Sequence, residues 1–208
     1  MTITKIERQK NDRGRFSIFV DDAYAFSVSE DIYARFVLYS GQSLTDEERT
    51  AIEKAEAEAS VKRIALRYRS FRPRSRRDVA DYLKKKGFAP PSIDIGLAFL
   101  DSQNLLNDAE YARMFVRDRM RLKPVGRSTM KQLLYRKGID RDLTDHVIAE
   151  IFPPEAEPAA ALKEAEKKWK RIAKLPELVR KKRLYEHLVR RGYEPGLAIT
   201  ITNRLNEQ

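Results

Sequence analysis

The sequence predicts a mainly α-helical fold with three tandem three-helix repeats in an elongated array, preceded by a small N-terminal antiparallel β-hairpin or meander. Two observations predict this fold. Apolar and polar residues alternate with a period of two up to residue 28, which is typical of half-buried strands. From residue 45 onward the period is helical, and one pattern recurs at intervals of 51 and 54 residues. The predicted bounds are 1–44 for the meander with a short helix, then 45–106, 107–154 and 155–208 for the repeats.

The N-terminal region combines three short apolar stretches with turn-forming residues. The predicted strands cover residues 3–6, 16–20 and 24–28. Residues 11–14 and the pair Asp21-Asp22 lie between them, and Asn, Asp and Gly are the residues that tight turns favour. We interpret Asp21-Asp22 as a hairpin turn rather than as a metal site. Residues 29–38 predict a short helix that ends before Gly41.

Capping signals mark the starts of two helices. Thr45 and Glu48 have the spacing of a capping box, in which each side chain bonds the backbone N–H of the other residue. The helix that follows is predicted to reach about residue 68. Asn107 and Glu110 repeat this spacing before a helix predicted to end near residue 121. Pro90-Pro91 and Pro153-Pro154 break helices and are predicted to mark boundaries.

The repeated pattern has the features of an amphipathic helix and its end. Apolar residues at i, i+3 and i+4 are followed by two basic residues, a glycine and a large apolar residue. The three copies end in Lys85-Lys86-Gly87-Phe88, Arg136-Lys137-Gly138-Ile139 and Arg190-Arg191-Gly192-Tyr193. The cations complement the helix dipole, and the glycine is predicted to end the helix in the left-handed conformation. A longer helix precedes each copy and a shorter one follows. The alternative to an array is one globular helical domain that contains the repeat.

Positive charge follows the repeat. The chain has 42 Lys and Arg against 31 Asp and Glu, a net charge of +11. Residues 62–86, 113–137 and 163–191 carry net charges of +9, +8 and +8, whereas 87–112 and 138–162 carry −4 and −5. A charge that recurs with a structural repeat predicts an acidic partner, with nucleic acid as the first candidate.

Helix geometry places many of these cations on outward faces. In the repeated helix of the first copy, Val79, Tyr82 and Leu83 define the core face. The cations predicted on the opposite side are Arg74, Arg77, Lys84 and Lys85.

The helix after Asn107 has the same division. Its predicted inward residues are Tyr111, Phe115 and Leu122, and its outward stripe is Arg113, Arg117 and Arg121. Arg117 has a like-charged neighbour four residues away on each side, which weakly destabilises a helix and so favours a partner. A solvated helix face is the alternative interpretation.

The complete set of predicted binding residues extends over all three repeats. It consists of Arg74, Arg77, Lys84, Lys85, Arg113, Arg117, Arg121, Arg127, Arg136, Lys182 and Arg190. Lys85, Arg136 and Arg190 are equivalent in the repeat and are predicted to project outward. We interpret Lys86, Lys137 and Arg191 as dipole and cap residues.

Several classes of site are disfavoured. The chain has no cysteine, which excludes disulfides, Cys-zinc sites, iron–sulfur clusters and thiol catalysis. Familiar phosphate-loop, zinc-protease and hydrolase motifs are missing, so we expect no enzyme, no metal and no cofactor. His146 is interpreted as a surface residue and His187 as a core-packing residue. No apolar run is long enough to span a membrane, and the N-terminus lacks a signal-peptide core, so a cytoplasmic protein is expected.

Several local patterns, in their order and spacing, resemble the RecX family of bacterial proteins that modulate the RecA recombinase. Residues 3–7 and 18–26 resemble its opening hairpin. In the first repeat the resemblance rests on residues 75–79, Leu83 and Lys86-Gly87. The junction and second repeat contribute Leu106-Asn107-Asp108, Tyr111-Ala112, Gly126, Leu133 and Lys137-Gly138-Ile139. Asp78-Val79 and His187 depart from the family pattern, and the third repeat is the weakest match.

The resemblance implies a partner and a mode of action. Family members are curved rods of three three-helix repeats that bind in the groove of the RecA–DNA filament and contact single- and double-stranded DNA. They usually inhibit ATP hydrolysis, strand exchange and co-protease activity, without a cofactor. We expect a monomer that regulates RecA in DNA repair, recombination and the SOS response. Two alternatives remain: a DNA-binding repeat protein without a recombinase partner, and a scaffold for an acidic protein.

Overall fold

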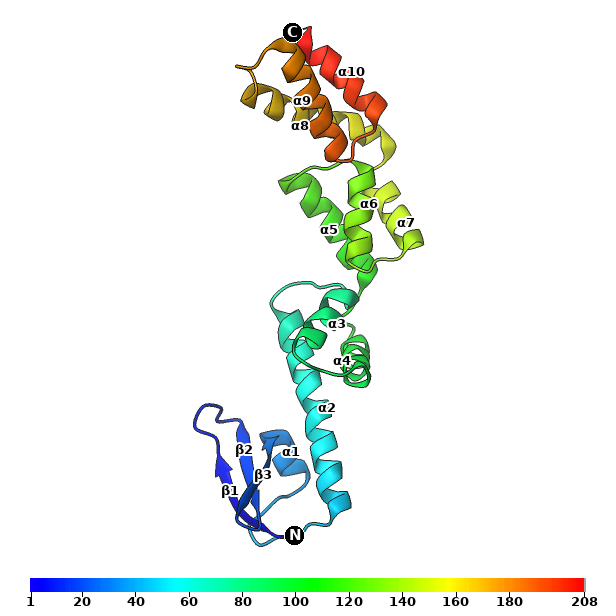
Figure 1. The fold of residues 1–208 in the computed structure, drawn as a ribbon. Helices are drawn as coiled ribbons and strands as arrows, with labels where there is room; N and C mark the ends of the chain where they lie inside the picture. Colours follow the sequence, from blue (N-terminus) through cyan, green and yellow to red (C-terminus); the bar gives the residue numbers. More distant parts are fainter. Residues whose placement is uncertain (208) are drawn as a thin grey trace. The chain divides into compact units, whose positions relative to one another are not determined.

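The computed structural model describes residues 1–207, which form two compact units. Residues 1–72 and 79–105 make up the first unit, and residues 73–78 with the chain from 106 onward make up the second. Figure 1 shows the small sheet near the N-terminus and helices in the rest of the chain. The predicted mainly α-helical class, with three three-helix repeats and an N-terminal antiparallel sheet, is confirmed.

The N-terminal sheet has three antiparallel strands in sequence order. They are β1 (Ile3–Arg8), β2 (Arg15–Val20) and β3 (Ala23–Ser29). Asp21 and Asp22 have φ angles of 48° and 65°, as in the two-residue hairpin turn that matches strand twist, so the predicted turn is confirmed. The helix predicted over 29–38 is shorter, α1 (Glu30–Arg35), because Val37 adopts a left-handed φ of 48° and turns the chain away.

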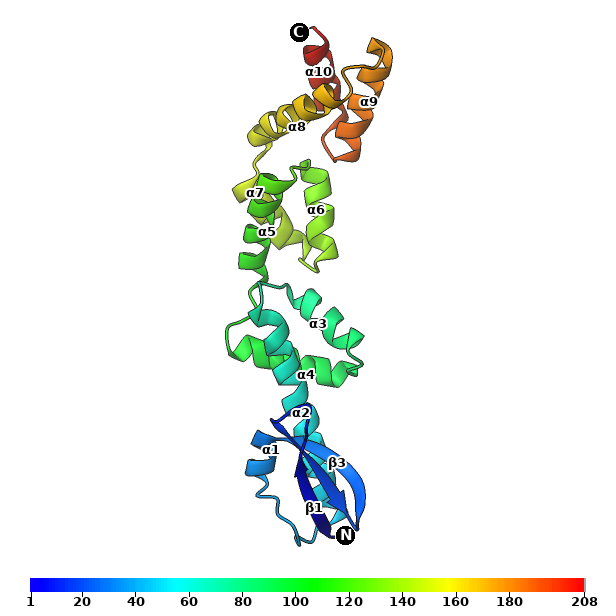
Figure 2. The same cartoon turned by 90° about the vertical axis from the view of Figure 1, so that its left-hand side faces the viewer.

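The long helix α2 (Asp46–Ser70) begins with the predicted capping box. The Thr45 hydroxyl accepts from Glu48 N, and the Glu48 carboxylate accepts from Thr45 N. The first half of α2 lies beside the sheet and α1 (Figure 2). Ile52, with the neighbouring Ala55 and Ala59, packs there in the core of the N-terminal region. The helix therefore completes the core of the N-terminal region as well as opening the first repeat.

A buried carboxylate fixes α2 to the sheet. Glu56 is only 8% exposed, and its oxygens accept from the Ser29 backbone N–H at 2.7 Å and from the Ser29 hydroxyl at 2.8 Å. Arg15 of β2 donates to the same carboxylate at 2.7 Å. A buried charge is tolerated when it is paired and hydrogen-bonded in this way.

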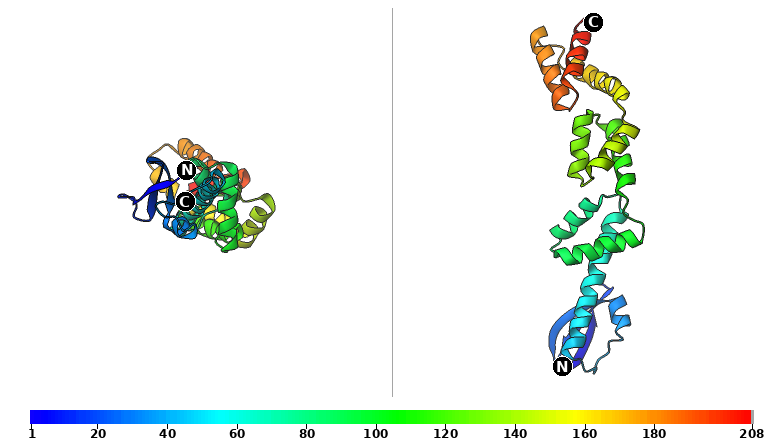
Figure 3. Two further views of the ribbon diagram at one scale, coloured as in Figure 1. Left: turned by 90° about the horizontal axis from the view of Figure 1, so that it is seen from below. Right: turned by 90° about the vertical axis from the view of Figure 1, so that its right-hand side faces the viewer.

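The second half of α2 packs with α3 (Arg76–Lys85) and α4 (Pro90–Ser102), which Figure 3 shows in its right-hand view. Gly96 of α4 makes this contact close, because a Cβ there would lie 3.1 Å from both Leu83 and Val61. The rings of Tyr68 and Tyr82 stack with centroids 3.8 Å apart. These contacts involve the part of α3 that belongs to the first unit.

The second unit contains two further three-helix groups, which Figure 2 shows separately. The second repeat consists of α5 (Asp108–Leu122), α6 (Arg127–Arg136) and α7 (Arg141–Ile151). After a short 3-10 helix, η1 (Pro154–Ala156), the third repeat consists of α8 (Glu157–Arg171), α9 (Glu177–Arg190) and α10 (Pro195–Asn206). Each group has its own apolar core, and Ala160 packs against both.

The repeated glycines end their helices as predicted. Gly87, Gly138 and Gly192 have φ angles of 89°, 79° and 83°. In each case the N–H of the residue after the glycine donates to a carbonyl five residues back, as from Ile139 to Leu134 at 3.1 Å and from Tyr193 to Leu188 at 3.2 Å. This is the bonding of a Schellman motif, and it explains the large apolar residue after each glycine.

Within the second unit, one kind of joint occurs twice. The Arg76 N–H at the start of α3 donates to the Asp108 carboxylate at 2.9 Å, and the Arg127 N–H at the start of α6 donates to the Glu157 carboxylate at 2.9 Å. Asp108 and Glu157 are the first residues of α5 and α8. The long helix of one repeat thus caps the middle helix of the repeat before it.

The glycine turn after α6 lies against the start of α3, and the glycine turn after α9 lies against the start of α6. A Cβ at Gly138 would lie 2.6 Å from Arg77 Cβ, and a Cβ at Gly192 would lie 2.6 Å from the Thr129 backbone nitrogen. In the second joint, the Gly126 N–H also donates to the Arg191 carbonyl at 2.9 Å. The glycines therefore have a packing role in addition to their left-handed conformation.

Candidate nucleic-acid interface

The cations predicted around α3 divide between the helix and the loop before it. Arg77, Lys84 and Lys85 lie on α3 with exposed side chains. Placing Arg74 on this helix was wrong, because the Ser75 hydroxyl accepts from Asp78 N at 3.1 Å and the helix begins at Arg76. Arg74 is half-buried in the preceding loop.

The predicted arginine stripe of α5 is only partly available. Arg113 donates through Nε to Glu150 of α7, with an N–O distance of 2.9 Å. Arg121 lies 3.4 Å from Asp118 on the same helix and is largely exposed, and Arg117 is exposed. Arg113 is thus committed to an internal ion pair, whereas Arg117 and Arg121 face solvent.

The prediction that Leu122 points inward was wrong. Its side chain is 68% exposed, whereas Tyr111 is buried and Phe115 packs against the core as predicted. Leu122 is the last residue of α5, and the chain turns away directly after it. Val125, in the linker that follows, is 1% exposed and fills the core.

The last-turn cations of the three middle helices form two classes. The last residue of each helix, which is Lys85, Arg136 or Arg190, is exposed. Of the other predicted cations, Arg77, Lys84 and Lys182 are also exposed, and Arg127 is half-buried. The residues that directly follow the three last residues have internal contacts: Lys86 lies over the Tyr82 ring at 5.6 Å, Lys137 pairs with Asp78 at 3.0 Å, and Arg191 pairs with Glu164 at 2.8 Å. Only the first class presents its charge outward in every repeat.

A basic pocket that the sequence did not predict lies in the second unit. It has a volume of about 190 Å³ and lies between the α5–α6 linker, α8 and α9. Its lining residues are Leu122, Lys123, Pro124, Glu164, Lys167, Lys168, Arg171, His187 and Arg191. The signal in the sequence is Glu164 on the inward face of its helix, together with His187 at a position that is apolar in the second repeat.

Glu164 and His187 form the polar floor of this pocket. Glu164 is 8% exposed, and its Oε1 lies 3.1 Å from His187 Nε2 and 2.8 Å from an Arg191 guanidinium nitrogen. Burial lowers the pKa of His187 from its ordinary value, and the nearby Glu164 only partly opposes this effect. His187 occupies the predicted core position, but its principal contact is with a carboxylate.

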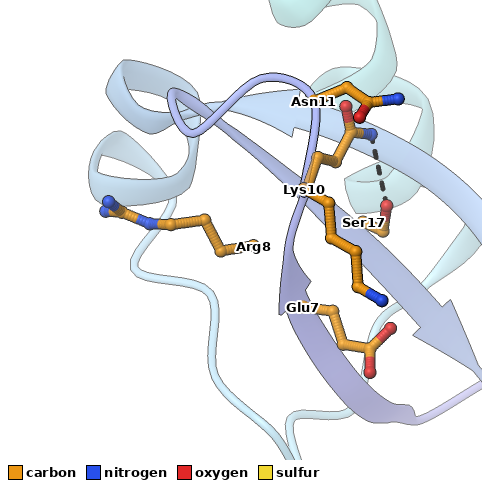
Figure 4. Close-up of a pocket in the computed structure, with 6 residues that line it drawn as sticks. Glu7, Arg8, Lys10, Asn11 and Ser17 are labelled. Atoms are coloured by element: carbon orange, nitrogen blue, oxygen red, sulfur yellow. Dashed lines mark hydrogen bonds between the residues drawn. The ribbon is translucent and has the colours of Figure 1, made fainter.

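A second hollow lies beside the β1–β2 loop. It has a volume of about 510 Å³ and is lined by Glu7, Arg8, Gln9, Lys10, Asn11 and Ser17. Figure 4 shows Arg8 directed away from Glu7 and Lys10. Arg8 pairs with Glu30 at 2.8 Å and Glu7 pairs with Lys5, so these charges are used within the sheet region.

Residues 1–207 contain neither a cluster of metal ligands nor a membrane-spanning helix. No group of three or more His, Asp or Glu side chains there could hold a metal ion. In the same residues, no helix is both long and apolar enough to cross a membrane.

The family of the chain follows from its similarity to known proteins. Four family models match it in order: the Regulatory protein RecX N-terminal domain over residues 1–45, and the first, second and third RecX three-helix domains over 62–100, 107–148 and 155–199. The chain belongs to the RecX family. A RecX regulatory protein of Listeria welshimeri is 32% identical over 99% of this chain and 78% of its own length. One from Bacillus licheniformis is 36% identical over 92% of this chain and 72% of its own length.

Solved RecX structures have the same fold. A crystal structure of a regulatory protein RecX superposes with a TM-score of 0.70 at 30% identity, covering 97% of this chain and 98% of that one. RecX from Lactobacillus salivarius gives a TM-score of 0.62 at 23% identity, over 74% of this chain and 99% of its own. The second comparison supports the fold alone.

Proposed function

We propose that this protein regulates the RecA recombinase by binding the RecA–DNA filament through exposed cations, and that it inhibits ATP hydrolysis, strand exchange and co-protease activity. The observation that carries the proposal is membership in the RecX regulatory family across nearly the whole chain. The chain's own residues supply the means of contact.

The exposed last-turn cations support an interface that follows the repeat. Lys85, Arg136 and Arg190 occupy equivalent positions and are all exposed. Arginine and lysine bind DNA phosphates through charge-assisted hydrogen bonds, and they bind acidic side chains on a protein in the same way. Arg117 and Arg121 add exposed charge in the second repeat, whereas the Glu150 pair of Arg113 makes it a weaker candidate.

The test compares two triple charge reversals. One variant combines Lys85→Glu, Arg136→Glu and Arg190→Glu, and the matched control combines Lys54→Glu, Lys163→Glu and Arg204→Glu. All six residues are exposed, so both variants change the net charge equally and leave the cores intact. Binding is measured on single-stranded DNA, bare and coated with ATP-bound RecA, at two or more salt concentrations, together with RecA ATP hydrolysis.

The repeat-position variant is expected to lose filament binding and inhibition, while the control retains both. On bare single strands, loss of three phosphate contacts would reduce the magnitude of the log–log salt slope by about 2, at about 0.7 per contact. Equal behaviour of the two variants would show that these positions are not the interface. Equal or tighter binding of the wild type to bare DNA would favour a DNA-binding repeat protein without a recombinase partner.

A further inference from the structure

The second and third repeats differ at two equivalent core positions. Helices α5 and α8 both have 15 residues and both begin with a carboxylate that caps the preceding repeat, so Glu164 corresponds to Phe115. The glycine spacing of 54 residues makes His187 correspond to Leu133. Phe115 and Leu133 pack against the apolar core of the second repeat, whereas Glu164 and His187 contact each other at 3.1 Å.

This polar pair is not required by the fold. A buried carboxylate loses hydration, and the loss is offset only when partners surround it. The second repeat shows that an apolar pair can fill the same two positions in a three-helix group with the same joints. The polar pair of the third repeat therefore indicates a requirement other than stability.

Cations concentrate around this pair. Lys123 comes from the α5–α6 linker, and Lys167, Lys168 and Arg171 come from α8. None of these four forms an ion pair within residues 1–207, whereas Arg191 pairs with Glu164. Like charges gathered at one hollow repel each other, and an anion in the hollow would remove that repulsion.

We infer that this pocket binds a phosphate group, which is either a backbone phosphate of a nucleic-acid strand or part of a free polyphosphate. Lysine supplies compact charges for phosphate oxygens, and arginine supplies paired N–H donors. Glu164 is a positioning residue, because it fixes the Arg191 and His187 side chains that line the pocket. The exposed Leu122 at the same pocket can contact an apolar part of the ligand. Phosphate binding at this pocket requires no recombinase partner.

The first experiment titrates the whole protein with inorganic pyrophosphate, monitored by amide NMR shifts and by calorimetry. Shifts are expected to concentrate in residues 122–124, 167–171 and 187–191. Lys168→Gln with Arg171→Gln should weaken pyrophosphate binding at least about tenfold, since two side chains that can donate charge-assisted hydrogen bonds to phosphate are removed. The matched control, Lys163→Gln with Lys170→Gln, removes two exposed charges of the same helix that do not line the pocket, and it should change affinity less than about twofold.

A competition experiment distinguishes the two sources of phosphate. If a short single-stranded oligodeoxythymidine displaces pyrophosphate and binds the pocket variant more weakly than the control, the pocket takes a strand phosphate. If pyrophosphate binds but the strand neither displaces it nor distinguishes the variants, the pocket takes a free polyphosphate.

Two outcomes would overturn the inference. One is an equal loss of pyrophosphate binding in the pocket and control variants, which would mean diffuse electrostatic attraction. The other is the absence of localised shifts in the wild type. The wild-type shifts decide the question even if the pocket variant fails to fold.

Discussion

The second and third repeats share a frame but differ in what they bury. Their long helices, α5 and α8, have equal length, and each begins with a carboxylate that caps the middle helix of the preceding repeat. Their middle helices end in the same glycine motif. Phe115 and Leu133 in one are replaced by Glu164 and His187 in the other. The features that the two repeats share are therefore the ones that the fold requires. The positions at which they differ, Glu164 and His187, indicate a requirement other than folding.

The two joints differ in the ion-pair partner of the basic residue that precedes the glycine. At the first joint, Lys137 pairs with Asp78 of the preceding helix at 3.0 Å. At the second joint, the residue equivalent to Asp78 is Thr129, and Arg191, which is equivalent to Lys137, pairs with Glu164 of its own repeat. The second joint has a backbone hydrogen bond instead, from Gly126 N to the Arg191 carbonyl, and the Arg191 guanidinium lines the basic pocket.

Substituting the glycines should have the largest effect on this frame. Gly192→Ala is expected to cost about 3 kcal/mol, because it combines left-handed strain with a clash against the Thr129 backbone. Gly87→Ala has the same left-handed strain, but nothing lies within 4 Å of the added Cβ, so about 1 kcal/mol is expected. Urea unfolding of the whole protein measures both. Equal losses would show that the joint does not depend on close approach at Gly192.

Substitutions of the buried pair Glu164 and His187 should have an intermediate effect on the free energy of unfolding. Glu164→Ala alone is expected to cost about 2 kcal/mol, because Arg191 and His187 lose their shared acceptor. Glu164→Phe combined with His187→Leu should stay within about 1 kcal/mol of the wild type, since an apolar pair often replaces a buried polar pair without loss.

The same urea measurements and pyrophosphate titration separate the two roles of this pair. The double variant should retain its fold but bind pyrophosphate more weakly than the wild type. A double variant less stable than Glu164→Ala would show that the polar pair is needed for folding.

The pH dependence of stability should show the smallest effect. Burial lowers the pKa of His187 in the folded protein below its unfolded value, with Glu164 acting in the opposite direction and Arg191 and Lys168 in the same one. At pH values between the folded and the unfolded pKa of His187, the unfolded chain binds more protons than the folded protein. The contribution of His187 to the free energy of unfolding is therefore complete above about pH 6.5 and is lost as pH falls through the folded pKa. His187→Leu should remove this part of the pH slope, which unfolding at a series of pH values measures. An unchanged slope would contradict the assignment to His187.

Local sequence signals were sufficient for most of the fold. The capping box at Thr45, the Asp21-Asp22 turn and the glycine ends of the middle helices depend on neighbouring residues, and the structure has them as predicted. The end of α1 was misplaced because it depends on a left-handed Val37, a conformation that β-branched residues seldom adopt. Leu122 was misplaced because helical periodicity does not show where a helix leaves its core.

The candidate site was harder to predict than the fold. Periodicity separates inward from outward side chains, but it does not show which outward cation meets a carboxylate of another helix. Arg113 was predicted to be part of an outward stripe and pairs with Glu150, 37 residues along the chain. The basic pocket combines residues from three segments, so no local pattern contains it.

The shared helix α2 also restricts how such a gene can be divided. A cut at the apparent boundary near residue 45 would separate the sheet from Ile52, which is 1% exposed, and from the Glu56 carboxylate that binds Ser29 and Arg15. The detached sheet would then present an apolar face to water. A chimera that exchanges this region with another protein therefore has to carry the first half of α2 with the sheet, and the crossover has to fall within a continuous helix.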